Sequence, residues 1–185
     1  MKKNFGAQTF LYPMPVLIIA SYNEDGSANA MNAAWGGIHD TNQIGICLSA
    51  EHKTVENILK KKEFTVSMAS ENTLEACDYL GLVSGNKVPD KVKRAGFTVS
   101  KAENTDAPVI NELPMVLECR LVSYDEKSGY MVADIVNVAA DEEVLTDGKI
   151  DVSKLKPITY DPVNHKYIAL GKAIGDAFKA GLAIK

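Results

Sequence analysis

Short apolar runs separated by turn-forming residues occupy the first third of the chain. Residues 15–22 form a β-rich run, residues 23–26 are typical of a turn, and a returning strand begins at Ala28. A third strand is predicted over residues 44–49. Residues 64–68 alternate apolar and small polar side chains, which is the pattern of a half-buried strand. This region is therefore predicted to consist mostly of strands.

Three helices are expected among and after these strands. The first covers residues 54–62, has apolar side chains at helical spacing and begins with Thr54 as its N-cap. Residues 72–75 have the arrangement of a capping box, which opens a second helix that ends at Gly81. A third, short helix is predicted over residues 90–96.

Two long strand patterns follow, over residues 115–124 and 130–140, joined by a polar hairpin loop over residues 125–129. Many strands with few helices favour a mainly β protein, built as a closed barrel decorated by helices, because closure removes exposed sheet edges. Residues 160–185 mix glycine and alanine with isolated aromatic residues. No repeat or linker divides the chain, so residues 1–185 are predicted to form one domain.

Two segments indicate a binding site. Residues 29–37 have strand context but are rich in small side chains, so this strand leaves room for a flat molecule against its backbone. His52 and Lys53 stand directly before the first predicted helix. Exposed backbone N–H groups, the Thr54 hydroxyl and cations at a helix start suit a phosphate. The combination favours a nucleotide-like cofactor, and a solvated basic surface is the alternative interpretation of the helix start.

Further motifs occur in a fixed order along the chain: Pro13-Met14-Pro15, residues 29–35, Glu51-His52-Lys53-Thr54, Cys77-Asp78-Tyr79, Ser84-Gly85-Asn86, Asp90-Lys91, residues 117–120, residues 141–145 and His165-x-Tyr167-x-x-Leu170-Gly171. The order and spacing of these motifs resemble the flavin reductase-like, or flavoredoxin, family of FMN-binding split-barrel proteins. The resemblance covers nearly the whole chain. The sequence departs from the family pattern at residues 41–43, where a proline pair is common, and at Asn86, where an acidic residue is common.

The resemblance implies an FMN-binding split β-barrel that forms a homodimer, with one FMN per subunit at or near the interface. It places the flavin along the strand at residues 29–35, and it supports a role for the loop at Ser84, for which a mobile surface loop is the alternative. It places His165 near the exposed face of the flavin as the catalytic candidate; packing of a C-terminal arm on the partner subunit is the alternative. The candidate cofactor-binding residues are Met31, Asn32, Ala33, Ala34, Trp35, Ser49, Glu51, His52, Lys53, Thr54, Ser84, Gly85, Asn86 and Lys91.

Other chemistry-bearing residues leave several interpretations open. Trp35, the single tryptophan, is consistent with a wall of the flavin site, a dimer contact or a core residue. The cysteines form no C-x-x-C pair and the histidines have no metal-ligand spacing, so no metal site is predicted. Cys47 and Cys119 lie in strand-like runs and are expected to be buried thiols, with a catalytic Cys–His pair as the alternative.

Composition and charge argue against several classes of protein. The chain has 185 residues, 46% of them hydrophobic, and a net charge of −4, which argues against nucleic-acid binding, and the run Lys60-Lys61-Lys62 is attributed to a solvated helix end. The N-terminus lacks the apolar run of a signal peptide, and the apolar run at residues 16–20 is too short to cross a membrane. A cytoplasmic protein with no membrane association is therefore expected.

Three functions stay open. The preferred hypothesis is an FMN-dependent oxidoreductase that takes electrons from NADH, NADPH or a redox protein and passes them on. The alternatives are a non-catalytic FMN electron carrier and a split-barrel module that binds haem or another flavin-like ligand without turnover. The chain has no G-x-G-x-x-G motif, so a Rossmann site for NAD is not expected.

Overall fold

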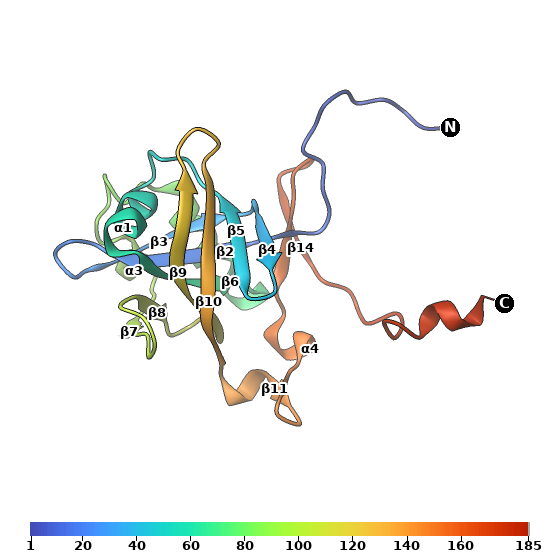
Figure 1. Cartoon of the computed structure of the whole chain (residues 1–185). Coiled ribbons are helices and arrows are strands. Elements are labelled where there is room, and N and C mark those ends of the chain that lie inside the picture. Colours follow the sequence, from blue (N-terminus) through green and yellow to red (C-terminus); the bar gives the residue numbers. More distant parts are fainter. Residues whose placement is uncertain (185) are drawn as a thin grey trace.

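A curled antiparallel sheet forms the centre of the computed structural model, which describes residues 1–184 (Figure 1). The strands are β1 (Met14–Pro15), β2 (Leu17–Tyr22), β3 (Ala28–Ala33), β4 (Gly36–Asp40), β5 (Gln43–Cys47), β6 (Glu63–Met68), β7 (Val99–Lys101), β8 (Pro108–Ile110), β9 (Met115–Asp125), β10 (Tyr130–Ala140), β11 (Leu145–Thr146), β12 (Lys149–Ile150), β13 (Ile158–Asp161) and β14 (Lys166–Ala169). The helices are α1 (Lys53–Lys61), α2 (Leu74–Leu82), α3 (Lys91–Arg94) and α4 (Val152–Leu155), with short 3-10 turns at Glu71–Thr73, Glu142–Val144 and Ala180–Ala183. Within residues 1–184 the central sheet has seven strands, in the order β3-β2-β6-β9-β10-β5-β4.

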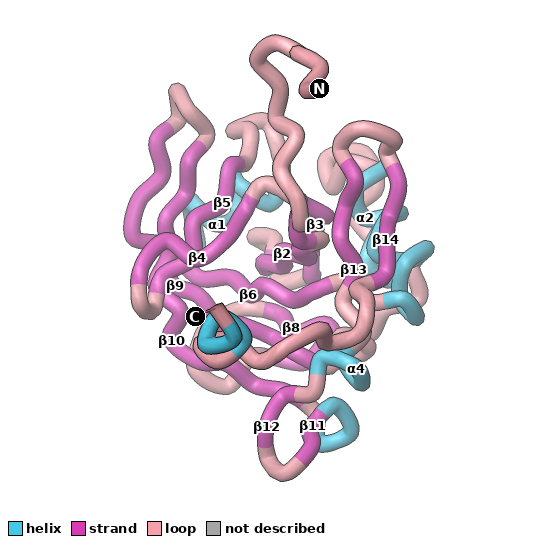
Figure 2. The backbone as a smooth tube through the Cα atoms, turned by 90° about the vertical axis from the view of Figure 1, so that its right-hand side faces the viewer, coloured by secondary structure: helices cyan, strands magenta, loops and turns pink. Residues whose placement is uncertain are grey.

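The central sheet rolls on itself but does not close. Its edge strands are β3 and β4, which are connected only by Ala34 and Trp35, so both edges start from one point. No hydrogen-bonded ladder joins these two strands within the described residues. The mainly β split-barrel fold is confirmed, whereas the expected full closure is not found. Figure 2 shows the rolled sheet from the side on which both termini project.

Alternation along β2 divides the hydrophobic core in two. Leu17 and Ile19 pack with Phe64 of β6 and Met131 of β10 inside the barrel. Ile18 belongs to a second cluster, shared with the buried side chains of α2 and α3. Because successive strand residues point to opposite faces of a sheet, a strand with two apolar faces serves both clusters. This explains why residues 15–22 form a nearly continuous apolar run.

Helix α1 packs on the inner core, and its start differs from the prediction. Val55 and Ile58 are fully buried in the same cluster as Ile19, in agreement with the predicted helical spacing. The N-cap is His52 and not Thr54. The Thr54 hydroxyl accepts a hydrogen bond of 2.7 Å from the buried side-chain amide of Asn29. A buried partner on β3 therefore draws the Thr54 side chain away from capping.

The second helix also begins and ends differently from the prediction. A capping box is present, but Ser70 and Thr73 form it instead of residues 72–75, and it opens the 3-10 turn that precedes α2. Gly81 lies inside α2 and does not end it. A Cβ atom at Gly81 would lie 3.1 Å from the Cβ of Asn32, so the glycine lets α2 approach β3 closely.

Several short elements escaped the sequence pattern. The long strands β9 and β10 and their hairpin loop are confirmed. The strands β4, β7, β8, β11 and β12 and the helix α4 contain two to five residues each, too few for a periodicity to show. The strands β13 and β14 pair with each other, and β13 also pairs with β1, so part of the C-terminal segment is ordered into a hairpin.

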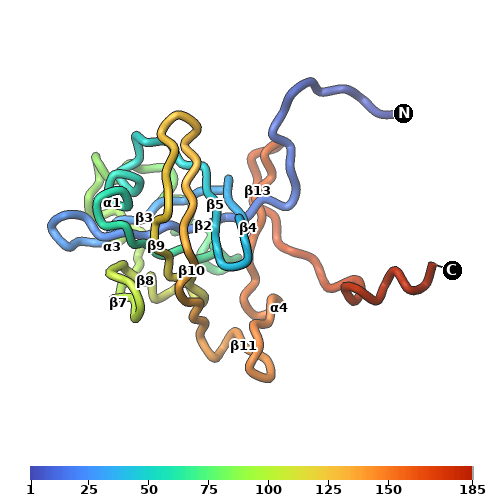
Figure 3. The backbone as a smooth tube through the Cα atoms, viewed as in Figure 1, coloured from blue at the N-terminus to red at the C-terminus, as the bar shows by residue number. Residues whose placement is uncertain are grey.

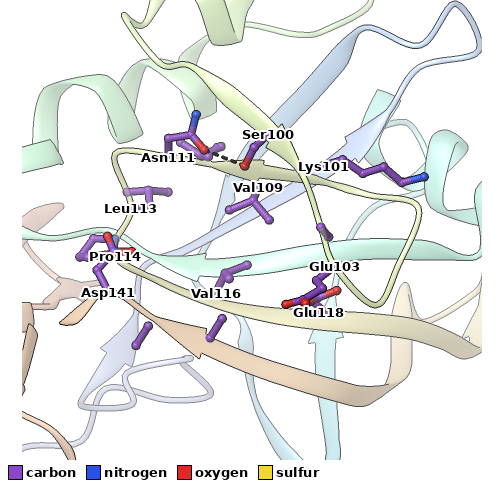
Figure 4. A pocket seen from close by; sticks show the side chains of 14 residues that line it. Ser100, Lys101, Glu103, Val109, Asn111, Leu113, Pro114, Val116, Glu118 and Asp141 are labelled. Carbon is purple, nitrogen blue, oxygen red and sulfur yellow. Dashed lines mark hydrogen bonds between the residues drawn. The ribbon is translucent and has the colours of Figure 1, made fainter. Parts of the chain in front are cut away.

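A buried carboxylate ties β9 to the loop between β7 and β8. Glu118 Oε2 accepts hydrogen bonds from the Asn104 backbone N–H (2.7 Å) and the Thr105 hydroxyl (3.2 Å), and Oε1 accepts from the side-chain amides of Asn104 (3.1 Å) and Asn137 (2.8 Å). Burial raises the pKa of Glu118, but these donors outweigh burial and hold the pKa below its usual value. Glu118 lines a cavity of about 380 Å³ beside this loop. Figure 4 shows its side chain among the others that line the cavity.

We expect Glu118→Gln to lower the free energy of unfolding by about 1–3 kcal/mol at neutral pH, because its amide N–H groups would face other donors. A carboxylate with a depressed folded-state pKa contributes stability above its unfolded-state pKa of about 4.3 and loses it as the pH falls through the folded-state value. Urea unfolding from pH 7 to pH 3 should therefore show the difference between the two proteins shrinking on acidification. Glu103→Gln, an exposed change in the same cavity wall, is the control; a difference that stays constant over this range contradicts the assignment.

Candidate functional site

Two adjoining cavities open beside β3. The first, of about 260 Å³, lies between β3, the start of α1, the end of α2 and the loop at residues 83–85. The second, of about 280 Å³, extends along Asn32, Ala33 and Ala34 toward Tyr160 and Tyr167 of the C-terminal hairpin. The two cavities share Asn32, Gly81 and Leu82. Together they form an elongated space that runs from a helix start to the small residues of an edge strand.

The start of α1 supplies hydrogen-bond donors to the first cavity. His52, Lys53 and Thr54 line it, and the first backbone N–H groups of a helix have no carbonyl partner within that helix. The Lys53 ammonium lies 3.1 Å from Glu56 Oε1, which also contacts Lys60 at 2.9 Å. The hydrogen bonds from Lys60 and Lys53 lower the pKa of Glu56. The Lys53 charge is therefore partly balanced and held at the cavity wall.

Lys91 brings a second ammonium to the same cavity. Its side chain is buried, and its Nζ donates hydrogen bonds to the carbonyl oxygens of Leu80 (2.9 Å) and Val83 (3.0 Å) at the end of α2. Burial lowers the pKa of Lys91 to about 8. Among the described residues no carboxylate forms an ion pair with it. A buried cation without a carboxylate beside a helix start is suited to an anionic ligand, because isolated buried charges are costly.

Gly85 fixes the loop that forms the far wall of the first cavity. A Cβ atom at Gly85 would lie 2.2 Å from Asn29 Oδ1 and 3.3 Å from the Cβ of Lys53, so a larger residue would displace the loop. Asn29 is itself buried, and its Oδ1 has no hydrogen-bond partner in the described residues. The absence of a side chain at Gly85 therefore lets this loop approach Asn29 closely.

The second cavity contains a network of polar side chains. The Tyr167 hydroxyl donates a hydrogen bond of 2.6 Å to Asp78 Oδ1. The Asn32 side-chain amide donates to the Cys77 carbonyl oxygen (3.2 Å) and to the Tyr167 hydroxyl (3.5 Å). Burial and the Asp78 hydrogen bond raise the pKa of Tyr167. The network joins β3, α2 and β14 across one face of the cavity.

Most of the predicted cofactor-binding residues line these two cavities. Trp35, Ser49 and Glu51 line a third cavity, of about 560 Å³, beside the β9–β10 hairpin loop. Asn86 is exposed and lines none of these three cavities; its backbone N–H donates to the Ser84 hydroxyl at 3.3 Å. The predicted residues in the first two cavities are Met31, Asn32, Ala33, Ala34, His52, Lys53, Thr54, Ser84, Gly85 and Lys91.

The structure places Trp35 on the surface and His165 outside the first two cavities. The core interpretation of Trp35 is wrong, because the side chain is 54% exposed. His165 lines neither of the first two cavities. Its Nδ1 lies 2.7 Å from the hydroxyl of Tyr160, which does line the second cavity. His165 therefore stands one side chain away from the candidate site.

Sequence reasoning missed residues that reach the cavities from α2 and the C-terminal hairpin. Asp78, Gly81 and Leu82 come from α2, and Tyr160 from β13. Asp78 and Tyr167 lie in separate segments of the chain, and no local pattern marks them as partners.

Across residues 1–184, no group of three or more His, Cys, Asp or Glu side chains is arranged to hold a metal ion. No helix in that range has the length and apolar character needed to span a membrane.

The sequence matches a known protein family, and the fold matches solved structures. Residues 9–163 match the model of the flavin reductase like domain. The chain belongs to this family. Among curated proteins, it is 27% identical over 122 residues to an uncharacterised protein of Aquifex aeolicus, and this match spans 60% of either chain.

Two solved flavoredoxins resemble the chain over its whole length. The flavoredoxin of Desulfovibrio vulgaris (Miyazaki F) is 35% identical with a TM-score of 0.93, and the match covers 98% of this chain and 100% of that one. The flavoredoxin of Methanosarcina acetivorans is 30% identical with a TM-score of 0.90, and the match covers 100% of both chains. This chain is therefore similar to flavoredoxins in both sequence and fold.

Proposed function

We propose that this chain is a flavoprotein oxidoreductase that binds FMN and passes electrons from NADH, NADPH or a reduced redox protein to an acceptor. The observation that carries the proposal is the cavity that combines the start of α1 with the buried ammonium of Lys91. Family membership and the similarity to two flavoredoxins support a flavin as the ligand.

The first cavity suits the phosphate end of FMN. Backbone N–H groups at the start of α1 and the ammonium groups of Lys53 and Lys91 would hold the phosphate. Ser84 and Gly85 would close the site from the opposite loop. This donor set is cationic and rich in N–H groups, so its chemistry fits a phosphate monoester.

The second cavity suits the flat end of the cofactor. Ala33 and Ala34 leave space beside the β3 backbone, and Asn32 provides a polar group where the two cavities meet. A bound FMN would supply the redox chemistry, accepting a hydride or electrons and passing them on. The chain would orient the cofactor and keep its polar groups paired.

His165 is proposed to act at the open side of the cofactor site, toward the electron donor. The Tyr160 hydroxyl holds its Nδ1, which leaves Nε2 without a protein partner in the described residues. An imidazole nitrogen at such a position can hydrogen-bond to an incoming molecule. His165→Ala should then slow reduction of the holoprotein more than it weakens cofactor binding.

We also propose that the chain forms a homodimer in which the partner subunit completes the cofactor site. Residues 170–184 run away from the body of the molecule (Figure 3) and carry the nearly fully exposed side chains of Ile174 and Phe178. Trp35 and Ile38, at the open edge of the sheet, are also exposed. Apolar side chains exposed in this way mark protein–protein contacts.

The proposed function predicts that denatured protein releases FMN and that NADH or NADPH, added anaerobically to the holoprotein, bleaches the flavin absorbance. No bleaching with either nicotinamide, but reduction by a ferredoxin-like donor, would identify an electron carrier instead. A protein that neither contains FMN nor can be reconstituted with it contradicts the proposal. Haem in the purified protein would support the binding-module alternative.

Lys53→Ala should weaken FMN binding about tenfold, because a charge-assisted hydrogen bond to phosphate contributes roughly 1.5–3 kcal/mol and Glu56 already balances part of the charge. Riboflavin, which lacks the phosphate, should bind both proteins equally. Lys61→Ala, at the exposed far end of α1, is the matched control. Fluorescence titration measures each dissociation constant, and equal weakening of FMN and riboflavin would show that Lys53 supports the fold and not the phosphate.

The dimer proposal predicts that FMN lowers the dimer dissociation constant and raises the melting temperature together, because a ligand that binds only the dimer stabilises it by linkage. Sedimentation across a dilution series, with and without FMN, measures this. Phe178→Asp should shift the equilibrium toward monomer. A holoprotein that is monomeric at micromolar concentration and keeps full affinity for FMN contradicts the shared site.

A further inference from the structure

Asn32 stands at the junction of the two cavities with its side-chain orientation defined by its neighbours. It is half-buried on the side of β3 that faces α2, where Gly81 allows the helix to come close. Its amide nitrogen donates to the Cys77 carbonyl oxygen at 3.2 Å. A carbonyl oxygen can only accept, so the nitrogen and not the oxygen of the Asn32 amide faces Cys77.

Tyr167 engages the same amide group. Its hydroxyl proton goes to Asp78 Oδ1 at 2.6 Å, so the hydroxyl oxygen is left to accept from Asn32 Nδ2 at 3.5 Å. Donation to a carboxylate makes a hydroxyl a better acceptor, because hydrogen bonds in a chain polarise one another. Burial and the hydrogen bond to Asp78 raise the pKa of Tyr167, as expected for a hydroxyl that donates to a carboxylate.

These contacts leave one group of Asn32 unpaired. The hydrogen bonds of its Nδ2 go to Cys77 and Tyr167, while Oδ1 has no donor among the described residues. The oxygen belongs to a residue that lines both cavities. Asn32 is thus an acceptor at a fixed position, and a ligand that fits it directs an N–H or O–H donor at the junction of the two cavities.

We propose that Asn32 Oδ1 accepts a hydrogen bond from the bound cofactor, and that Tyr167, supported by Asp78, is the positioning residue that holds the Asn32 amide in this orientation. The inference rests on the proposed function, because it takes FMN as the ligand. FMN offers two donors of this kind, the imide N–H of the ring and the hydroxyl groups of the sugar chain. Neither Tyr167 nor Asp78 needs to touch the cofactor for this role.

Binding measurements on apoprotein test the acceptor. Asn32→Leu should weaken FMN about two- to tenfold, the value of one neutral hydrogen bond. If the ring imide is the donor, FMN methylated at the imide nitrogen should bind wild-type protein more weakly than FMN, and Asn32→Leu should abolish this preference. If a sugar hydroxyl is the donor, lumiflavin, which lacks the sugar chain, should bind both proteins equally. Equal affinity of wild type and Asn32→Leu for all three ligands overturns the proposal.

A second pair of variants tests the positioning role. Tyr167→Phe removes the hydroxyl and should weaken FMN about two- to threefold, since the acceptor is present but no longer fixed. Asp78→Asn retains an oxygen that accepts from Tyr167, so this variant should bind FMN with an affinity close to that of wild type. Tyr124→Phe is the matched control, because the Tyr124 hydroxyl also donates a hydrogen bond, to the Leu48 carbonyl oxygen at 2.8 Å, but Tyr124 lines neither cavity.

The outcomes separate this inference from the proposed function. If wild-type apoprotein does not bind FMN, the proposed function fails. If wild-type protein binds FMN and Tyr167→Phe matches it in affinity and in discrimination against the methylated flavin, the positioning role alone is overturned. Equal losses in Tyr167→Phe and Tyr124→Phe overturn it as well, because they would report general destabilisation of the protein.

Discussion

Burial of both faces of the curled sheet is the constraint on which the rest of this molecule depends. Leu17 and Ile18 are neighbours in β2, yet one packs inside the barrel and the other against α2 and α3. The inner core requires α1 as a cover, and the outer face requires α2 and α3. The start of α1, the end of α2 and the edge strand β3 therefore meet around one cavity. The candidate site is a by-product of how the two cores are covered.

The electrostatics of this cavity depend on Lys91. The start of a helix carries partial positive charge and the end carries partial negative charge, and here the start of α1 and the end of α2 face the same space. The Lys91 ammonium satisfies the carbonyl oxygens of Leu80 and Val83 at the end of α2. The negative helix end is thereby neutralised, and the cavity stays favourable for an anion. An anionic ligand would in turn compensate the buried charge of Lys91.

The sequence predicted the site in part because some of its signals are local. His52, Lys53 and Thr54 are neighbours at a helix start, and β3 is one continuous segment rich in small residues, so both were recognisable from the order of residues. The capping role of Thr54 was wrong for a tertiary reason, since its hydroxyl accepts from Asn29 on β3. The same holds for Gly81, which was expected to end a helix and instead lets α2 approach Asn32.

The sequence by itself determined the strands β2, β3, β5 and β6, the long β9–β10 hairpin and the core face of α1, because these depend on periodicity within a short window. Only the tertiary structure decided which side chains meet across the cavities. Asp78 and Tyr167 form a hydrogen bond although they lie 89 positions apart, and Lys91 binds carbonyl groups of another helix. Such contacts depend on how the sheet curls and where α2 and the C-terminal hairpin come to lie, and no local pattern of residues encodes them.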